Sequence, residues 1–187
     1  MTNYCNGSHD KYLSYKCHEY LSKQLDEPTL SDRNKVYLEI ALNSLGEAKY
    51  NEFFKHNIIN ELAARLGNDG VFWHSYTNTT CNYINFKLNE SLRTHYSDVH
   101  KVDYSIFREF VKIFYNKRHN NYDVEYSCEN YIRHLDDDIY KRMLTLYKIF
   151  YLYNEFKISN NYKHTTSDDE LCNKLSFLIH LSNDSIE

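Results

Sequence analysis

The sequence predicts an all-α protein, a compact bundle of roughly six to eight helices braced by disulfides. Glycine and proline are scarce, with four Gly and one Pro in 187 residues, which leaves few turn positions for a sandwich or barrel of many short strands. Long segments instead repeat their apolar residues at the spacing of a helix. The length suits a single domain with a substantial core, expected over residues 10–182.

A first helix is predicted from Asp10 to about Leu25. It follows a loose leader over residues 1–9 and is closed by Pro28, which cannot continue a helix. The apolar face of this helix is a row at steps of four: Leu13, Cys17 and Leu21.

Two further helical segments follow. The first opens at Ser31 or Asp32, whose side chains can accept hydrogen bonds from the first free N–H groups. Its predicted inward residues are Val36, Tyr37, Ile40, Ala41 and Leu45. The second runs from Glu47 to Leu66 and ends at Gly67, the residue type that takes the left-handed turn closing a helix. Its apolar row is Phe54, Ile58, Leu62 and Leu66, widened by Ile59 and Ala63.

The only tryptophan follows a turn, Asn68-Asp69-Gly70. We expect Trp73 to anchor this loop against the core. The alternative is that Trp73 is exposed and acts as a binding hot spot.

The central predicted helix runs from Thr79 or Thr80, either of which can cap it, to Arg93. One face carries Cys81, Ile84, Leu88 and Leu92, and the remaining surface carries Asn82, Asn85, Lys87, Asn89, Glu90 and Arg93. Cys81 therefore lies in the first turn on the buried side. It can either tie this helix to a neighbour through a disulfide or fill a small gap in the core.

Three further helices and an exposed loop are predicted in the rest of the chain. Asp103 can cap a helix whose broad apolar face predicts contact with two other helices: Ile106, Phe107, Phe110, Val111, Ile113 and Phe114. An exposed loop is expected from Asn116 to Asp123. Asp137 or Asp138 begins the longest pattern, with a seam of Ile139, Met143, Leu146, Phe150 and Tyr153. A capping box at Ser167 and Glu170 starts a last helix, with Leu171, Leu175, Leu178 and Ile179 inward, before a tail over 183–187.

Charge and composition weigh against two classes of partner. The net charge is −4 and no run of Lys or Arg exceeds two residues, so no basic face for nucleic acid is expected. No run of about eighteen apolar residues is present, and we expect no membrane span in this chain. The 19 Tyr and 10 Phe are explained either by the codon bias of an AT-rich genome, which we favour, or by an adhesive surface.

Chemistry-bearing motifs are absent from the sequence, so we predict no enzyme, no cofactor and no metal. There is no H-E-x-x-H and no glycine-rich phosphate loop, and His95 and His100 stand five apart, where helical metal ligands need three or four.

The five cysteines are Cys5, Cys17, Cys81, Cys128 and Cys172, scattered about one per helical segment. They predict either long-range disulfides in an oxidising compartment, with one thiol left over, or buried free thiols in a cytosolic protein. Cys5, in the leader, is the expected free thiol.

Two blocks of sequence resemble a known family. Cys81-Asn82-Tyr83-Ile84-Asn85-Phe86-Lys87-Leu88 is similar to the Cys-x-x-Leu-Asn-Tyr-Trp-Leu signature of the Plasmodium interspersed repeat (PIR) proteins, especially the Vir branch. The block from His134 to Tyr153 resembles the family's later helix, in which a short acidic turn precedes a Lys-x-Met-x-x-Leu-Tyr-x-x-Tyr pattern. The blocks stand in the family order at about the family spacing, and the resemblance covers roughly residues 10 to 180. Where such proteins often carry another cysteine, this chain has Leu62-Ala63-Ala64-Arg65, which puts at least one family disulfide in question.

The resemblance implies a variant surface antigen of a malaria parasite. Such a protein is exported to the infected red cell, where its helical ectodomain meets host receptors or antibodies and serves immune evasion. Membrane attachment would come only through a segment that is absent from this chain. We expect sequence variation and partner docking in three polar loops: 68–79, 116–126 and 159–167.

Two expectations about the cysteines accompany this interpretation. At least one disulfide should involve Cys81, and the expected pairings are Cys17 with Cys81 and Cys128 with Cys172. The competing interpretation is an intracellular helical adaptor, with five reduced thiols and an exposed groove for a partner helix.

Overall fold

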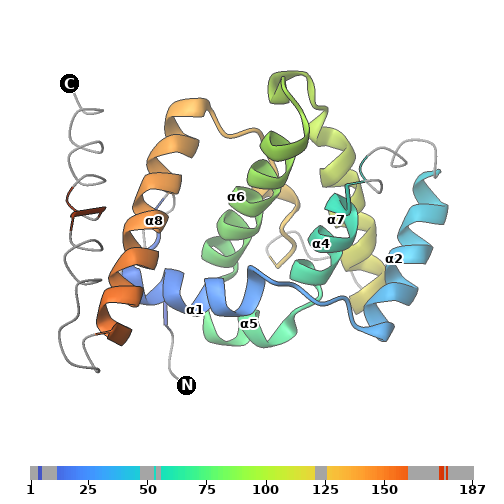
Figure 1. Ribbon diagram of the computed structural model, residues 1–187. Helices are drawn as coiled ribbons and strands as arrows, with labels where there is room; N and C mark the ends of the chain where they lie inside the picture. Colours follow the sequence, from blue (N-terminus) through green and yellow to red (C-terminus); the bar gives the residue numbers. More distant parts are fainter. Residues whose placement is uncertain are drawn as a thin grey trace. The chain divides into compact units, whose positions relative to one another are not determined.

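The computed structural model describes residues 4–5, 12–46, 53, 56–120, 126–159, 173–174 and 176. Over these residues the chain forms seven α-helices and no strand, which confirms the all-α class. They are α1 (Tyr15–Leu25), α2 (Asp32–Leu45), α4 (Ile58–Leu66), α5 (Asp69–His74), α6 (Thr77–His95), α7 (Tyr104–His119) and α8 (Asp137–Ser159), with two short 3-10 turns, η2 (Val99–Lys101) and η3 (Glu129–Tyr131) (Figure 1).

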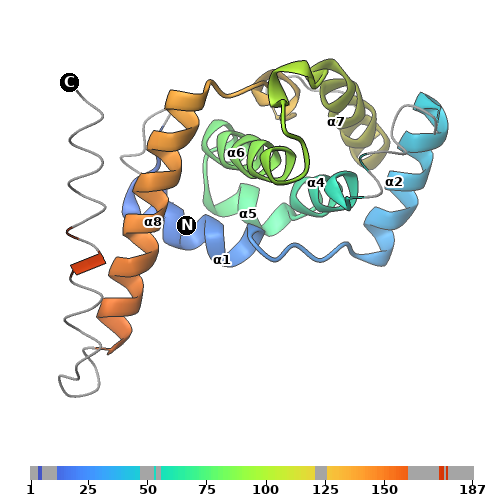
Figure 2. The ribbon, with the colours of Figure 1, turned by 45° about the horizontal axis from the view of Figure 1, so that its top comes forward.

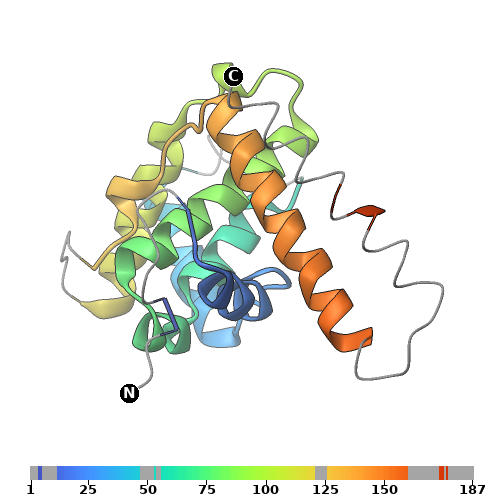
Figure 3. The same cartoon turned by 90° about the vertical axis from the view of Figure 1, so that its left-hand side faces the viewer.

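The chain divides into two compact units, residues 1–135 and 136–187. In the second unit α8 runs as one unbroken helix from the predicted start at Asp137 (Figure 3). Of its predicted seam, Met143 is buried whereas Tyr153 is 44 % exposed. The last helix predicted from Ser167 lies outside the residues that can be described in full. The predicted division into a leader (1–9), one domain (10–182) and a tail (183–187) stays a prediction.

Helix α6 is the centre of the first unit. Helices α1, α4 and α5 pack against it, and Figures 1 and 2 show them around it. The predicted face of Cys81, Ile84, Leu88 and Leu92 is buried, but so are Tyr83, Asn85, Phe86 and Asn89. The helix is therefore enclosed on nearly every side, and the prediction that Asn85 and Asn89 belong to its outer surface is wrong.

Helix α2 presents a different face to the core from the one predicted. Its buried residues are Asn34, Leu38, Ala41 and Leu42, whereas Val36 and Ile40 are 54 % and 38 % exposed. The helix carries apolar residues on two faces, and helices α4 and α7 pack on the face that includes Asn34.

A close approach at Gly67 explains the choice of that face. The amide of Asn34 donates a hydrogen bond to the carbonyl of Gly67 at 3.2 Å, and a Cβ at position 67 would lie 2.0 Å from the same amide nitrogen. Gly67 has a φ of −80°, so the prediction of a left-handed turn there is wrong. The glycine is needed because it leaves room for Asn34.

The predicted helix caps are confirmed for α2 and α7, whereas the cap predicted for α6 at Thr79 or Thr80 is wrong, because that helix begins at Thr77. The hydroxyl of Ser31 accepts a hydrogen bond from the N–H of Asn34 at 3.3 Å, and the carboxylate of Asp103 accepts one from Ser105 at 2.9 Å, as predicted. Helix α7 continues to His119 and ends at Asn120, which has a φ of 52°. The loop predicted from Asn116 therefore begins four residues too early, since residues 116–119 are helical.

Candidate functional site: an aromatic-rimmed cavity beside helices α5 and α7

Helix α5 turns its tryptophan outward. Val71 is completely buried, whereas Trp73 is 68 % exposed. The prediction that Trp73 anchors this segment against the core is therefore wrong, and the alternative of an exposed tryptophan holds. Two residues along a helix correspond to a rotation of about 200°, which places Trp73 nearly opposite Val71. The sequence of α5 is too short to show which face would be covered.

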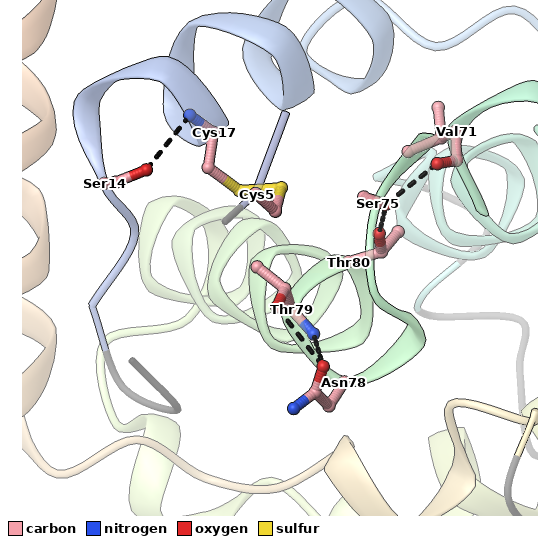
Figure 4. Close-up of a disulfide and its surroundings, with 8 residues drawn as sticks. All are labelled: Cys5, Ser14, Cys17, Val71, Ser75, Asn78, Thr79 and Thr80. Carbon is pink, nitrogen blue, oxygen red and sulfur yellow. Dashed lines mark hydrogen bonds between the residues drawn. A yellow bond between two sulfur atoms is a disulfide. The ribbon is translucent and has the colours of Figure 1, made fainter. Parts of the chain in front are cut away.

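A pair of hydroxyl groups fixes the junction between α5 and α6. The Ser75 hydroxyl donates a hydrogen bond to the carbonyl of Val71 at 2.8 Å and forms a second hydrogen bond with the hydroxyl of Thr80 (Figure 4). Both side chains are buried. In the next turn, the Asn78 amide oxygen accepts a hydrogen bond from the N–H of Thr79 at 2.8 Å. The bond between Ser75 and Thr80 joins the end of α5 to the start of α6.

Arg118 joins the end of α7 to the α4–α5 connection. Its guanidinium donates to the carbonyls of Leu66 at 3.1 Å and Gly67 at 2.9 Å, and it forms an ion pair with Asp69. The Arg118 side chain is only 8 % exposed. A guanidinium bound to the last carbonyls of a helix satisfies groups that the helix itself cannot pair. Arg118 thereby closes one wall of a cavity.

This cavity has a volume of about 400 Å³. Its inner wall is apolar, because Val111, Phe114 and Cys128 are buried. At its edge Trp73 and Tyr126 are 68 % and 59 % exposed, and we call these two residues the aromatic rim. The described residues that line it are Leu66, Asp69, Phe72, Trp73, Thr77, Val111, Phe114, Tyr115, Arg118, His119, Tyr126 and Cys128.

The charges of the lining residues balance. The carboxylate of Asp69 compensates the guanidinium of Arg118 through their ion pair. Burial lowers the pKa of His119, and the positive charge of Arg118 lowers it further, although the negative charge of Asp69 opposes them. The His119 imidazole is therefore neutral at pH 7, and its ring stacks on Tyr115 with centroids 4.4 Å apart. The described part of the lining thus carries no net charge and is rich in aromatic side chains.

Two of the three predicted docking loops meet at this cavity. Residues of the 68–79 segment line one side, and residues of the 116–126 segment line the other. Both segments are more helical than predicted, since they include α5, the start of α6 and the end of α7. The third loop, 159–167, lies outside the described residues except for its first residue. Sequence reasoning missed Phe72 and Tyr115, because their contribution depends on the contact between α5 and α7.

One stripe of α6 holds the segment that precedes the second unit. Cys81, Asn85, Asn89 and Arg93 recur at steps of four, and all four bind residues 128–135, which we call the strap. Cys81 is bonded to Cys128, and the amide oxygen of Asn85 accepts from the Arg133 N–H at 3.0 Å. Arg93 donates to the carbonyl of Leu135 at 2.6 Å.

Asn89 has the densest set of these hydrogen bonds. Its amide nitrogen donates to the carbonyl of Arg133 at 3.0 Å, and its amide oxygen accepts from the Leu135 N–H at 3.0 Å. The same oxygen accepts from the hydroxyl of Tyr104 at 2.7 Å. Burial raises the pKa of Tyr104 to about 12, so that hydroxyl keeps its proton and remains a donor.

The observed disulfides differ from the expected pairings. Cys81 does form a disulfide, as expected, but with Cys128 and not with Cys17. Cys17 pairs with Cys5, which is 1 % exposed, so the prediction of a free thiol at Cys5 is wrong (Figure 4). The pairing of Cys128 with Cys172 is also wrong, and Cys172 itself lies outside the described residues.

The N-terminal segment is held at the two residues of it that are described. Besides the disulfide of Cys5, the N–H of Tyr4 donates to the carbonyl of His74 at 3.2 Å. The Tyr4 ring stacks on Tyr20 of α1, with centroids 4.6 Å apart. The loose leader predicted for this segment therefore does not describe Tyr4 and Cys5.

His95 and His100, the histidines considered as metal ligands, pack against different rings. His95 stacks on His56 with centroids 4.3 Å apart, and His100 lies 4.6 Å from the ring of His134. Over the described residues, no three His, Cys, Asp or Glu side chains converge as metal ligands would. Among the helices of the described part of the chain, none combines the length and apolarity that crossing a membrane requires.

The fold and cavity together describe an all-α, disulfide-braced protein with an aromatic-rimmed cavity. Comparison with protein families, with curated proteins and with solved structures found no match to this chain.

Proposed function

We propose that this chain is the helical ectodomain of a PIR-type variant surface protein of a malaria parasite. It would be exported to the surface of the infected red cell, where it binds a host cell-surface protein or an antibody and serves immune evasion. The resemblance of the blocks around Cys81 and His134 to the PIR patterns motivates this proposal. The two disulfides are consistent with an oxidising compartment.

The aromatic rim is the observation that best supports the binding of a partner. Trp73 and Tyr126 belong to two of the segments expected to vary and dock a partner, and both are more than half exposed beside one cavity. Tryptophan and tyrosine supply much of the binding energy at protein interfaces because they provide large, rigid contact areas. The covalently braced helices behind them would hold the rim in place.

Screening the purified chain against a panel of host red-cell and endothelial surface proteins tests this function. A specific hit should lose at least about tenfold in affinity with Trp73→Ser or Tyr126→Ser, since interface aromatics often contribute more than about 1.4 kcal/mol. Tyr151→Ser is the matched control, because Tyr151 is 61 % exposed but lies on α8. Equal loss with all three variants, or with none, would count against the rim as the docking surface.

Non-reducing peptide mapping distinguishes this proposal from an intracellular adaptor. Protein purified from its native compartment should yield cross-linked peptides joining Cys5 to Cys17 and Cys81 to Cys128. Recovery of all five cysteines as freely alkylated peptides would support the adaptor.

A further inference from the structure

The cavity beside α5 and α7 has the size of a small-molecule site. Its volume is about 400 Å³, within the range of roughly 300–1,000 Å³ that is usual for ligand pockets. An apolar cavity of roughly 150 Å³ in another protein accommodates one benzene molecule. A single aromatic side chain from a partner would therefore leave more than half of this space unfilled.

The lining indicates an uncharged ligand. The inner wall is formed by Val111, Phe114 and the Cys128 end of a disulfide, and aromatic rings surround the opening. Arg118 and Asp69 compensate each other, and the guanidinium is already bonded to two carbonyls. A charged ligand group would have to leave water without gaining a counter-ion of its own from the described lining residues, which costs several kcal/mol.

Hydrogen bonds and a disulfide join the walls of the cavity to one another. Arg118 ties α7 to the end of α4, the Ser75 and Thr80 hydroxyl groups tie α5 to α6, and the Cys81–Cys128 bridge ties α6 to the inner wall. A preformed apolar cavity binds without the cost of ordering its own side chains.

We propose that this cavity binds a small, uncharged, lipophilic molecule of two to three aromatic rings, held between Phe72, Trp73 and the buried face of α7. This inference goes beyond the proposed function and does not depend on it, because it requires no host protein.

The only tryptophan of the chain lines the cavity and reports on occupancy. Titration of the full chain with N-phenyl-1-naphthylamine, an uncharged two-ring probe with a phenyl substituent, should quench Trp73 emission saturably at one equivalent, with energy transfer to the probe. No saturable quenching in the wild-type chain would overturn the proposal.

Thr77→Phe places a ring in the cavity and should weaken probe binding at least about tenfold, equivalent to about 1.4 kcal/mol. Thr29→Phe makes the same change in a separate, more polar groove and should leave binding unchanged. Equal affinities in the two variants would place the probe elsewhere and contradict the proposal. If Thr77→Phe fails to fold by circular dichroism, Val111→Phe, which adds a ring to the inner wall, replaces it with the same expectation.

A negatively charged analogue of the probe tests whether the cavity prefers an uncharged ligand. 8-Anilinonaphthalene-1-sulfonate has the same aromatic body as the neutral probe plus one sulfonate, so it should bind at least about tenfold more weakly. Equal or tighter binding of the sulfonate would overturn the assignment of an uncharged ligand. Failure of these titrations would leave receptor binding by the rim untouched, since that binding is measured with the empty protein.

Discussion

The Cys81–Cys128 bridge separates two regions that use their side chains in opposite ways. On the strap side, polar side chains such as Asn85 and Asn89 are buried and bonded to the backbone of residues 133–135. On the cavity side, the aromatic side chains of Trp73 and Tyr126 remain exposed. A buried amide destabilises the fold unless it has hydrogen-bond partners. An exposed aromatic side chain does not contribute the stabilising free energy that its burial would provide. The first region therefore contributes stability, and the second has contact area available for a ligand or partner.

The largest loss of stability should come from removing the bridge between the two regions. The double variant Cys81→Ala/Cys128→Ala opens a loop with a sequence separation of 47 residues, and the chain-entropy model gives a loss of about 4 kcal/mol. Urea unfolding of the oxidised proteins measures it. Cys5→Ala/Cys17→Ala is the control, with a separation of only 12 residues and an expected loss of about 3 kcal/mol. A larger loss of stability in Cys5→Ala/Cys17→Ala than in Cys81→Ala/Cys128→Ala would contradict this prediction.

The second-largest loss of stability should come from a substitution that releases the strap and leaves both disulfides intact. Asn89→Ala leaves the Leu135 N–H, the Arg133 carbonyl and the Tyr104 hydroxyl without their partner, and should destabilise the fold by about 3 kcal/mol. Asn43→Ala, at an exposed position of α2, should change stability by less than about 0.5 kcal/mol. Both are read from chemical unfolding at pH 7. An Asn89→Ala variant as stable as Asn43→Ala would show that the strap is not held by this residue.

A smaller effect concerns the contact of α1 with α6, where His18 packs edge-on against Tyr83 at 5.9 Å. Burial lowers the pKa of His18 to about 4, with a further lowering by Lys87 and an opposing effect of Asp26. A lowered pKa means that the unfolded chain binds the proton more readily, so this stability is complete above about pH 6.5 and is lost as the pH falls towards 4.

The wild-type protein should therefore lose about 2 kcal/mol more between pH 7 and pH 5 than His18→Gln. The free energy of unfolding at the two pH values measures the difference. Asn43→Gln, a change without a titratable group at an exposed position of α2, should retain the wild-type pH dependence. Identical slopes in wild type and His18→Gln would rule out His18 as the titrating group.

The sequence predicted the features that depend on neighbouring residues. The helix class, the starts at Ser31, Asp103 and Asp137, and the buried apolar row of α6 follow from local capping and periodicity. These signals act within a few residues, so no knowledge of tertiary contacts is needed to read them.

The features that the sequence did not predict depend on distant partners. Asn85 and Asn89 are buried because the strap, 44 to 48 residues further along, supplies their partners. Val36 and Ile40 were expected inside because α2 has two apolar faces, and the choice between them depends on the contacts with α4 and α7 and on the close approach of Asn34 to Gly67. Disulfide pairing likewise cannot be deduced from spacing alone.

The candidate site was predicted in part. Two of the proposed loops do border one cavity, and the exposed alternative for Trp73 holds. The cavity itself was not foreseen, because it requires Arg118 to bind the α4–α5 connection across 51 and 52 residues. The charge balance of the lining likewise depends on a distant pair, because Arg118 forms an ion pair with Asp69.

The smallest effect on stability should come from the aromatic rim. Trp73→Ser should change the free energy of unfolding by less than about 0.5 kcal/mol, because a side chain that is 68 % exposed contributes little burial. The matched control is Val71→Ser on the same helix: Val71 is completely buried, and its replacement should cost about 2 kcal/mol. Urea unfolding of the two variants, followed by circular dichroism since one lacks the tryptophan, gives both values. A Trp73→Ser loss as large as that of Val71→Ser would mean that Trp73 supports the fold and is not available for binding.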